Sequence, residues 1–447
     1  MIKIEAKEER YLYNAYHMIK AFYASEEIEQ CCKKNQKEDL KLTETDGTSQ
    51  IFTIDTDHTH CVNDIRRELD RKVYQYLVHR TGKELAWGML TGVRPAKLAT
   101  KAVEQGVEKT EFIKQFQEEY LVSAEKAGLA YDIAVRERDV LSELDYKDGY
   151  SLYVGIPFCP STCLYCSFTS YPLAKWANHM DEYLDALEKE IAFTAEACKH
   201  KVLNSVYIGG GTPTALEKEE LDILITALYK ELDLSKIKEF TVEAGRPDSI
   251  TRGKLEVLKK HNVSRISINP QTMNDDTLKM IGRGHTSAQV IEKFNLARSM
   301  GFNDINMDMI IGLPGEGIKE VLHTKNEILK LKPDSLTVHG LSLKRASILY
   351  ENFILKKGIQ VKKQEELAQM YEESRILAQE LGLHPYYMYR QKNMVGNMEN
   401  LGYSRKGAEC IYNIEMIEDK QTIIALGADA VSKVVFLNEN RIERFAN

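Results

Sequence analysis

Three cysteines lie within eight consecutive residues of this chain. Cys159, Cys163 and Cys166 are spaced C-x3-C-x2-C in the stretch "GIPFCPSTCLYCSF". Thiolates this close either bind a metal or are inert, and a loop with two prolines is a poor place to bury inert thiols. A structural zinc site needs four ligands, and the loop contains no histidine and has no second cysteine pair downstream. A [4Fe–4S] cluster on three cysteines would leave one iron open, and we predict such a site.

The remaining cysteines are Cys31, Cys32, Cys61, Cys198 and Cys410. Eight cysteines in 447 residues are too dilute for a disulfide framework. We expect these five to be reduced and without a role in the chemistry, and we expect a cytoplasmic protein. The formal net charge of −7 does not favour nucleic acid as a partner. No apolar run reaches the roughly 20 residues that span a bilayer, and the start "MIKIEAKEER" has no hydrophobic signal region.

The cysteines directly follow the first of six short runs with strand character. These runs are "SLYVGI", "NSVYIG", "EFTVEA", "SRISI", "DINMDMII" and "SLTVHG", and segments of helical periodicity separate them. Strands that alternate with helices predict parallel βα units. Six units are too few for a closed eight-fold barrel. We therefore predict an α/β fold with a partial (β/α)6 barrel over residues 147–350.

Two further regions flank the predicted barrel. Residues 1–146 predict an α+β domain of unknown role, with a strand at "IKIEA", a helix at "ERYLYNAYHMIKAFY" and a hairpin strand at "SQIFTIDT". Pro95 in "LTGVRPAKL" suits the start of a helix. Residues 351–447 predict a mostly helical region that covers the substrate, because "QEELAQMYEESRILAQEL" carries one apolar stripe.

Polar or flexible residues follow successive predicted strands, where barrel active sites are built. They are Gly209, Gly210, Gly211 and Thr212 after the second strand, Glu243 at the end of the third, Gln271 after the fourth, Asp308 in the fifth, and Arg283 in "GRGHT". The glycines permit close approach of a ligand, and Arg283 could hold a carboxylate. Each alone also fits an ordinary turn or a surface ion pair. Their common phase predicts a polar ligand beside the cysteines.

The cysteine spacing, with Tyr165 before the last cysteine, resembles the radical S-adenosylmethionine (SAM) enzymes. The resemblance implies that SAM binds the open iron through its amino and carboxylate groups. One electron from the cluster then cleaves SAM, and the resulting 5′-deoxyadenosyl radical removes a hydrogen from the substrate. It also implies a one-electron donor such as a flavodoxin or ferredoxin.

Several longer motifs narrow the resemblance. "YVGIPFCPSTCLYCSF", "YIGGGTPT", "TVEAGRPD", "INPQTMND", "DMIIGLPGE" and "ALGADAVSK" together resemble the oxygen-independent coproporphyrinogen III oxidase family, and "LTGVRP" its HemZ-like branch. The resemblance implies that SAM is bound by Tyr153, Tyr165, Gly210, Gly211, Thr212, Glu243, Gln271, Arg283, Asp308, Ser342 and Val431. Family members can also bind a second SAM. The resemblance assigns no catalytic side chain.

Two positions depart from the best-known oxidases. Gly155 stands where they have histidine, and Phe168 stands where they have a fourth cysteine. That cysteine is not a cluster ligand, so the departures concern the substrate and not the cluster.

Three functions remain open. The first is oxidative decarboxylation of two coproporphyrinogen III propionates to vinyl groups, the coproporphyrinogen dehydrogenase step of porphyrin and haem biosynthesis. The second is a haem-modifying enzyme acting by methyl transfer and ring opening, and the third is a haem chaperone without catalysis. Basic and aromatic residues that could bind an acidic macrocycle are Lys344, Arg345, Tyr386, Tyr387, Tyr389, Arg390 and Lys392. A packed aromatic corner is the alternative interpretation of these residues.

Overall fold

The computed structural model describes residues 1–23, 26–54, 62–92, 94–168, 170–342, 347–349, 351, 364–390 and 398–447. Two compact units divide the chain. One comprises Met1–Asp132 with Tyr389–Glu399, and the other Ile133–Met388 with Asn400–Asn447. The domain boundaries that we placed after residues 146 and 350 remain predictions.

The first unit contains a four-stranded sheet in the order β2-β1-β3-β4. Its strands are β1 (Ile2–Ala6), β2 (Ile28–Cys32), β3 (Leu40–Thr43) and β4 (Ser49–Phe52). The long helices α1 (Glu9–Phe22) and α2 (Val62–Thr81) pack with this sheet into one apolar core, and α3 (Ala96–Glu104) and α4 (Lys109–Tyr120) follow. Pro95 directly precedes α3, as its fixed φ near −65° favours. The predicted strands at "IKIEA" and "SQIF" and the tyrosine-rich helix are confirmed.

The second unit contains the predicted partial barrel. Six parallel strands lie side by side in the order β5-β8-β9-β10-β11-β12, so neighbours in the sheet are also successive along the chain. They are β5 (Gly149–Ile156), β8 (Val202–Gly210), β9 (Glu239–Gly245), β10 (Arg265–Ile268), β11 (Ile305–Ile311) and β12 (Ser335–Gly340). All six predicted strands are confirmed.

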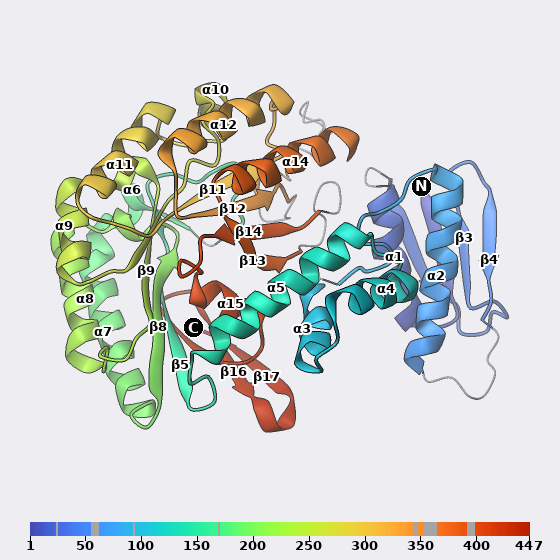
Figure 1. Ribbon diagram of the computed structural model, residues 1–447, viewed down its shortest axis with the longest axis horizontal. Helices are drawn as coiled ribbons and strands as arrows, with labels where there is room; N and C mark the ends of the chain where they lie inside the picture. Colours follow the sequence, from blue (N-terminus) through green and yellow to red (C-terminus); the bar gives the residue numbers. More distant parts are fainter. Residues whose placement is uncertain are drawn as a thin grey trace. The chain divides into compact units, whose positions relative to one another are not determined.

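Helices form an outer layer around these strands (Figure 1). They are α7 (Met180–Ala197), α8 (Lys218–Glu231), α9 (Arg252–Lys260), α11 (Ser287–Ser299) and α12 (Ile318–Leu331), with α14 (Gln364–Glu380) after the last barrel strand. The predicted stripe Leu221, Leu224 and Leu228 is buried on α8. The α/β fold with six βα units is therefore confirmed.

The strands alternate in polarity, which separates two faces of the barrel sheet. In β9, for example, Phe240 and Val242 are buried apolar residues, whereas Glu239, Thr241 and Glu243 occupy the positions between them. Because the neighbouring strands have the same phase, polar side chains meet across the sheet on one face. Ser205 donates to Ser151 (2.7 Å), and Ser335 donates to Asn306 (3.0 Å). This face can hold a polar ligand.

The expectation of a mostly helical region at 351–447 is wrong. Its described residues contain α14 and the short helix α15 (Ile411–Ile417), but also β13 (His384–Tyr389), β14 (Asn400–Ser404), β15 (Thr422–Leu426), β16 (Val431–Phe436) and β17 (Arg441–Ala446). The open barrel leaves two edges, and these strands extend the sheet beyond both of them. β14 pairs antiparallel with β12, and β15 pairs parallel with β5. The 17-residue helix α14 has a clear apolar stripe, whereas the strands have only five or six residues each and give a weaker local pattern.

Helix α15 closes one end of the polar face. Its Glu415 accepts hydrogen bonds from Ser151, from Ser205 (3.3 Å) and from Gln421 (2.7 Å). Burial raises the pKa of this carboxyl to about 8. The amide of Ile411 donates to Glu239 (2.7 Å), which fixes the start of the helix. The opposite end of the barrel, where the strands end, is left for the site.

Within the described residues, no helix is both long enough and apolar enough to cross a membrane.

Candidate active site

The three-cysteine loop begins where β5 ends and is held by its neighbours. β6 (Phe158–Cys159) pairs with β7 (Tyr171–Pro172), which brings the two ends of the loop together. The amide of Leu164 donates to the carbonyl of Ile281 (2.9 Å), and the hydroxyl of Ser161 donates to the carbonyl of Gly282 (3.0 Å). The loop is thus fixed by the segment between α10 (Asp275–Met280) and α11.

The three thiols share one electrostatic environment. Burial raises the pKa of Cys159, and the neighbouring Cys166 and Cys163 raise it further, while a contact with the Thr212 hydroxyl opposes this. The sulfur of Cys159 lies 3.5 Å from the Thr212 oxygen. Three thiolates here repel one another unless a cationic centre lies between them. This donor set therefore suits an iron–sulfur cluster.

A single bound metal ion fits this loop less well. Among the described residues, no three His, Cys, Asp or Glu side chains are gathered closely enough to hold one ion. A [4Fe–4S] cluster binds each cysteine at a different iron, so its three sulfurs need not converge on one point. Three cysteines that do not converge on one point are compatible with such a cluster.

The glycine-rich stretch after β8 passes directly beside the cysteine loop. A Cβ atom on Gly211 would lie 2.8 Å from the carbonyl oxygen of Phe158 and 2.9 Å from the sulfur of Cys159. Gly210 has a φ of +112°, which side chains other than glycine rarely allow. The amide of Gly211 donates to the carbonyl of Ile156 (2.8 Å). The glycines are therefore needed for the close approach of the two loops, apart from any ligand.

Glu243 lies on the polar face of β9 and accepts a hydrogen bond from the hydroxyl of Tyr207. Burial raises the pKa of Glu243 to about 7, against the effect of this hydrogen bond. Tyr207 also stacks on Tyr412, with ring centroids 4.3 Å apart, and Tyr153 stacks on both rings. A stack of three tyrosines therefore lies beneath Glu243, and burial raises the pKa of Tyr153 above its usual range.

Asp308 and Gln271 are brought together by β11. The amide of Gln271 donates to the carbonyl of Asp308 (2.9 Å), and the amide of Ile310 donates to the carbonyl of Gln271 (2.9 Å). Burial acts to raise the pKa of Asp308, but the nearby His339, whose Nε2 lies 3.7 Å from the carboxylate, and a hydrogen bond from Asn306 (2.7 Å) outweigh it, so the pKa is lowered. Gln271 has a φ of +65°, a strained backbone that functional sites often contain.

Arg283 links the site to the cysteine loop. Its guanidinium donates to the hydroxyl of Tyr165 (3.1 Å), the residue before the third cysteine. Burial and the charge of Arg283 lower the pKa of the nearby His285 to about 4, so this imidazole is neutral. Arg283 therefore carries a buried positive charge close to the thiols.

Ser342 and Val431 are the remaining predicted SAM contacts. Ser342 is buried just after β12. Val431 is 43% exposed and begins β16, next to the turn whose Asp429 accepts a hydrogen bond from Tyr171 (3.0 Å). The turn before Val431 thus contacts the cysteine loop. The exposed side chain of Val431 has the least structural support among the predicted SAM contacts.

Buried polar atoms without partners test whether a polar ligand fits. Among the residues that the structure describes, the buried polar atoms without a hydrogen-bond partner include Thr241 Oγ1, Ser267 Oγ, Asn269 Oδ1, Gln271 Oε1 and Arg283 Nε. Each costs about 1–3 kcal/mol when left unpaired. Thr241 lies on β9, Ser267 lies on β10, and Asn269 and Gln271 directly follow β10, whereas Arg283 lies between α10 and α11 and contacts the cysteine loop through Tyr165. SAM carries amino, carboxylate and hydroxyl groups that could pair with them, so the residues present fit this cofactor.

Sequence interpretation missed Arg246. This buried arginine directly follows β9 and lies with its Nη1 3.8 Å from the sulfur of Cys163. It also donates to the side chain of Asp248 through two hydrogen bonds of 3.1 and 2.8 Å. The one signal in the sequence was the position of this residue: "GRPD" directly follows a predicted strand, as several of the other site residues do.

The structure shows the surroundings of Gly155 and Phe168, the two positions that differ from the best-known oxidases. A Cβ on Gly155 would lie 3.2 Å from the carbonyl oxygen of Leu426, because β15 lies against β5 at this point. Phe168, in the place of the fourth cysteine, is 71% exposed. A large apolar side chain thus stands on the cysteine loop.

The predicted basic surface for an acidic macrocycle is not found at Arg390. Arg390 belongs to the first unit, is buried, donates to the carbonyl of Leu90 (2.8 Å), and lies over the ring of Trp87. Tyr386 and Tyr387 are buried as well. The packed aromatic corner is the better interpretation of these residues, and Lys344, Arg345 and Lys392 lie outside the described residues.

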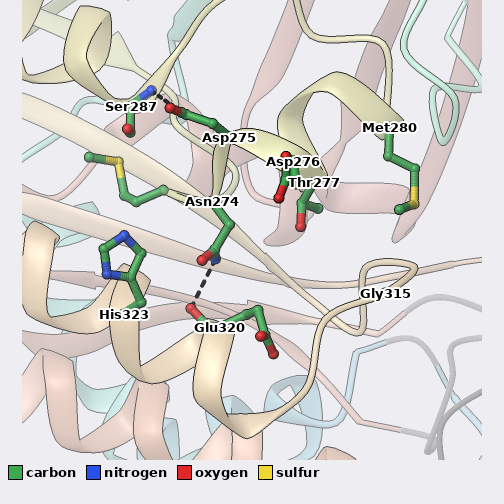
Figure 2. A pocket seen from close by; sticks show the side chains of 10 residues that line it. Asn274, Asp275, Asp276, Thr277, Met280, Ser287, Gly315, Glu320 and His323 are labelled. Carbon is green, nitrogen blue, oxygen red and sulfur yellow. Dashed lines mark hydrogen bonds between the residues drawn. The ribbon is translucent and has the colours of Figure 1, made fainter.

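One pocket lies away from the cysteine loop. It has a volume of about 430 Å³ and lies between α10, the start of α11 and α12. Figure 2 shows Asp275 bonded to the amide of Ser287 and the amide group of Asn274 bonded to the carbonyl of Glu320. The carboxylate of Asp275 already serves one of these local contacts, and we assign the pocket no part in the site.

Known proteins match this chain along most of its length. A family model described as the radical SAM superfamily matches residues 153–328. The oxygen-independent coproporphyrinogen-III oxidase-like protein HemZ of Bacillus subtilis is 43% identical over 403 residues, which cover 89% of this chain and 80% of that protein. The heme chaperone HemW of the same organism is 34% identical over 272 residues, covering 61% of this chain and 68% of that protein.

A solved structure shares the fold. Coproporphyrinogen III oxidase (HemN) from Escherichia coli aligns with a TM-score of 0.53 at 22% identity, over 66% of this chain and 67% of that one. This chain therefore belongs to the radical SAM superfamily. Within it, the chain is a member of the oxygen-independent coproporphyrinogen III oxidase family, in the HemZ-like branch.

Proposed function

We propose that this protein is a radical SAM oxidoreductase that converts propionate side chains of coproporphyrinogen III to vinyl groups without oxygen. The observation that carries the proposal is that the three-cysteine loop contacts both Thr212, after β8, and Arg283, a residue with a partnerless buried polar atom. The substrate is supported by the name of the HemZ relative, whose similarity covers both units of this chain.

In the proposed site, Cys159, Cys163 and Cys166 would hold a [4Fe–4S] cluster. Together, the cluster and SAM supply a radical that can remove a hydrogen atom. Arg283 would bind the carboxylate of SAM through a charge-assisted hydrogen bond. Glu243 would accept from the ammonium group, and the positive charge would lower the raised pKa of Glu243 and keep it ionised.

The other predicted contacts have simpler roles. The amide of Gln271 and the carboxylate of Asp308 suit the ribose hydroxyls. The ring of Tyr153 would lie at the base of the site. Gly210, Gly211 and Thr212 bring backbone close to the methionyl end, with Tyr165, Ser342 and Val431 at the rim. A second SAM stays a prediction.

The reaction balances for each propionate. One hydrogen atom leaves the β-carbon, and the C–C bond to the carboxylate then breaks. Carbon dioxide and one electron depart, and a vinyl group remains. The scheme needs one electron from a donor such as a flavodoxin or ferredoxin and an acceptor for the electron released.

A haem chaperone is the second candidate, favoured by the similarity to HemW. Anaerobic protein with reconstituted iron and sulfide should be incubated with SAM, dithionite and either coproporphyrinogen III or haem. The oxidase predicts 5′-deoxyadenosine and products lighter by one or two formic acid equivalents. A chaperone predicts unchanged haem that passes to an apoprotein. A methylated or ring-opened product would identify the third function, a haem-modifying enzyme.

A further inference from the structure

Arg246 lies at the junction of two loops of the site. Its Nη1 donates to both the carbonyl and the hydroxyl of Ser161, each at 3.0 Å. The same nitrogen lies 3.8 Å from the sulfur of Cys163, within hydrogen-bond reach of a sulfur acceptor. Arg246 is only 4% exposed. A shielded positive charge therefore points at one of the three thiols.

Asp248 and the space left by Gly284 also fix the position of the Arg246 guanidinium. Asp248 accepts from Nε and Nη2 of Arg246, the bidentate geometry that fixes a guanidinium plane. A Cβ on Gly284 would lie 2.7 Å from the Asp248 carboxylate and 3.2 Å from Nη2 of Arg246. Only glycine at 284 leaves room for the pair. Segments after β5, after β9 and before α11 thus converge on one side chain.

Hydrogen bonds to the sulfurs, nearby charge and solvent exposure set the reduction potential of an iron–sulfur cluster. Adding an electron makes the cluster more negative, so a buried cation next to a ligand sulfur stabilises the reduced form more than the oxidised form. Arg283 also lies near the thiols, but its hydrogen bond goes to Tyr165 and not to a sulfur. Arg246, in contrast, lies with its Nη1 3.8 Å from the sulfur of Cys163.

We propose that Arg246 is a positioning residue that raises the reduction potential of the cluster through Cys163. The negative charge of Asp248 partly compensates the arginine charge and so lowers this potential. This inference rests on the proposed cluster. It predicts that the two partners act with opposite signs. Removing the arginine makes reduction harder, whereas removing the negative charge of Asp248 leaves the arginine charge less compensated and makes reduction easier.

The test compares Arg246→Met, Arg246→Lys and Asp248→Asn with the parent protein, all reconstituted anaerobically. Iron and sulfide content is measured first, and the midpoint potential is then taken from a redox titration followed by electron paramagnetic resonance. Arg246→Met should lower the ratio of reduced to oxidised cluster at fixed potential about tenfold, which is about 59 mV for one electron. Arg246→Lys should give a smaller fall, and Asp248→Asn a rise.

A purely structural role would not produce shifts of opposite sign. Unchanged potentials, or a fall in all three variants, would overturn the inference. If Arg246→Met loses its iron, the lysine and Asp248 variants decide the question, and loss of iron from all three would show that Arg246 only ties the loop together. If the parent protein itself holds no iron and sulfide, the proposed function fails instead.

Discussion

The cysteines of the loop differ in their immediate partners, although the sequence presents them as a uniform motif. Cys159 contacts the Thr212 hydroxyl, and Cys163 faces Arg246. Outside the loop, this unit has one further partly buried cysteine, Cys198, which follows α7. At the residue scale, function thus depends on which atoms surround each thiol.

Replacing one ligand tests the cluster assignment. Cys163→Ala should remove most of the iron, the inorganic sulfide and the brown absorbance near about 400 nm that thiolate-bound clusters give. Iron analysis and the visible spectrum of anaerobic protein measure this. Cys198→Ala is the matched control and should keep both. An unchanged spectrum in Cys163→Ala would refute the ligand assignment.

Replacing Arg283 tests the SAM carboxylate. Arg283→Ala should raise the dissociation constant of SAM about 10- to 100-fold, because a hydrogen bond to a charged group contributes about 1.5–3 kcal/mol. Isothermal titration under anaerobic conditions measures the affinity, and the iron content should not change. The exposed Arg252 supplies the control variant Arg252→Ala. Equal SAM affinity in both variants would contradict the assignment.

At the scale of elements, the site depends on loops that follow neighbouring parallel strands. The turn after β8 and the loop after β5 touch because β5 and β8 pair in register up to Ile156 and Gly210. Gly211 is the point of contact, and its missing side chain leaves room for the sulfur of Cys159. The strands thus set the distance between the loops, and glycine permits it.

Gly211→Ala should therefore disturb the loop without unfolding the barrel. Its Cβ would clash with the carbonyl of Phe158 and the sulfur of Cys159, so we expect at least half of the iron to be lost while far-ultraviolet circular dichroism stays the same. Gly128→Ala is a control in α5 (Ala124–Ser142), where a Cβ meets only ordinary contacts. Alanine there should stabilise the helix by up to about 1 kcal/mol. Full iron content in Gly211→Ala would contradict this prediction, because it would show that the loop can shift to accommodate the added methyl group.

At the scale of the whole chain, its C-terminal part completes the barrel unit. β15 adds to β5, and α15 brings Glu415 against Ser151 of β5 and Ser205 of β8. Residues more than two hundred positions apart in the sequence thereby share one buried polar network. This network stabilises the end of the barrel opposite the cysteines.

The network predicts a pH dependence of stability. The pKa of Glu415 is raised to about 8 by burial, from an ordinary value of 4.5. The folded state therefore binds more protons than the unfolded state between these values, so the free energy of unfolding falls as the pH rises through this window. The loss is at most about 1.4 kcal/mol per pH unit.

Urea unfolding of the parent protein and Glu415→Gln at pH 6 and pH 8.5 checks this prediction. Glutamine cannot ionise, so the variant should lose less stability between the two pH values than the parent does. Glu256→Gln, at an exposed position of α9, should follow the parent. Parallel pH profiles for Glu415→Gln and the parent would refute the role of this carboxyl.

Local patterns in the sequence were enough to predict the barrel, which the structure confirms, and a set of ligand side chains, which stay a prediction. Alternating polarity marks each strand, and parallel strands that follow one another in the sheet end at the same edge, so residues such as Glu243 and Asp308 share that edge without knowledge of the coordinates. The cysteine spacing predicts the metal site for the same reason, because both signals are local.

Contacts between segments far apart in the sequence follow from the tertiary structure alone. Arg246 reaches a cysteine 83 positions away, Gly155 faces a strand near the C-terminus, and Arg390 packs against backbone carbonyls and not toward a ligand. Such contacts depend on which edges of an open sheet later strands occupy and on how loops fold over one another. No local pattern encodes these outcomes, because the free energy that selects them comes from burial and pairing across the whole unit.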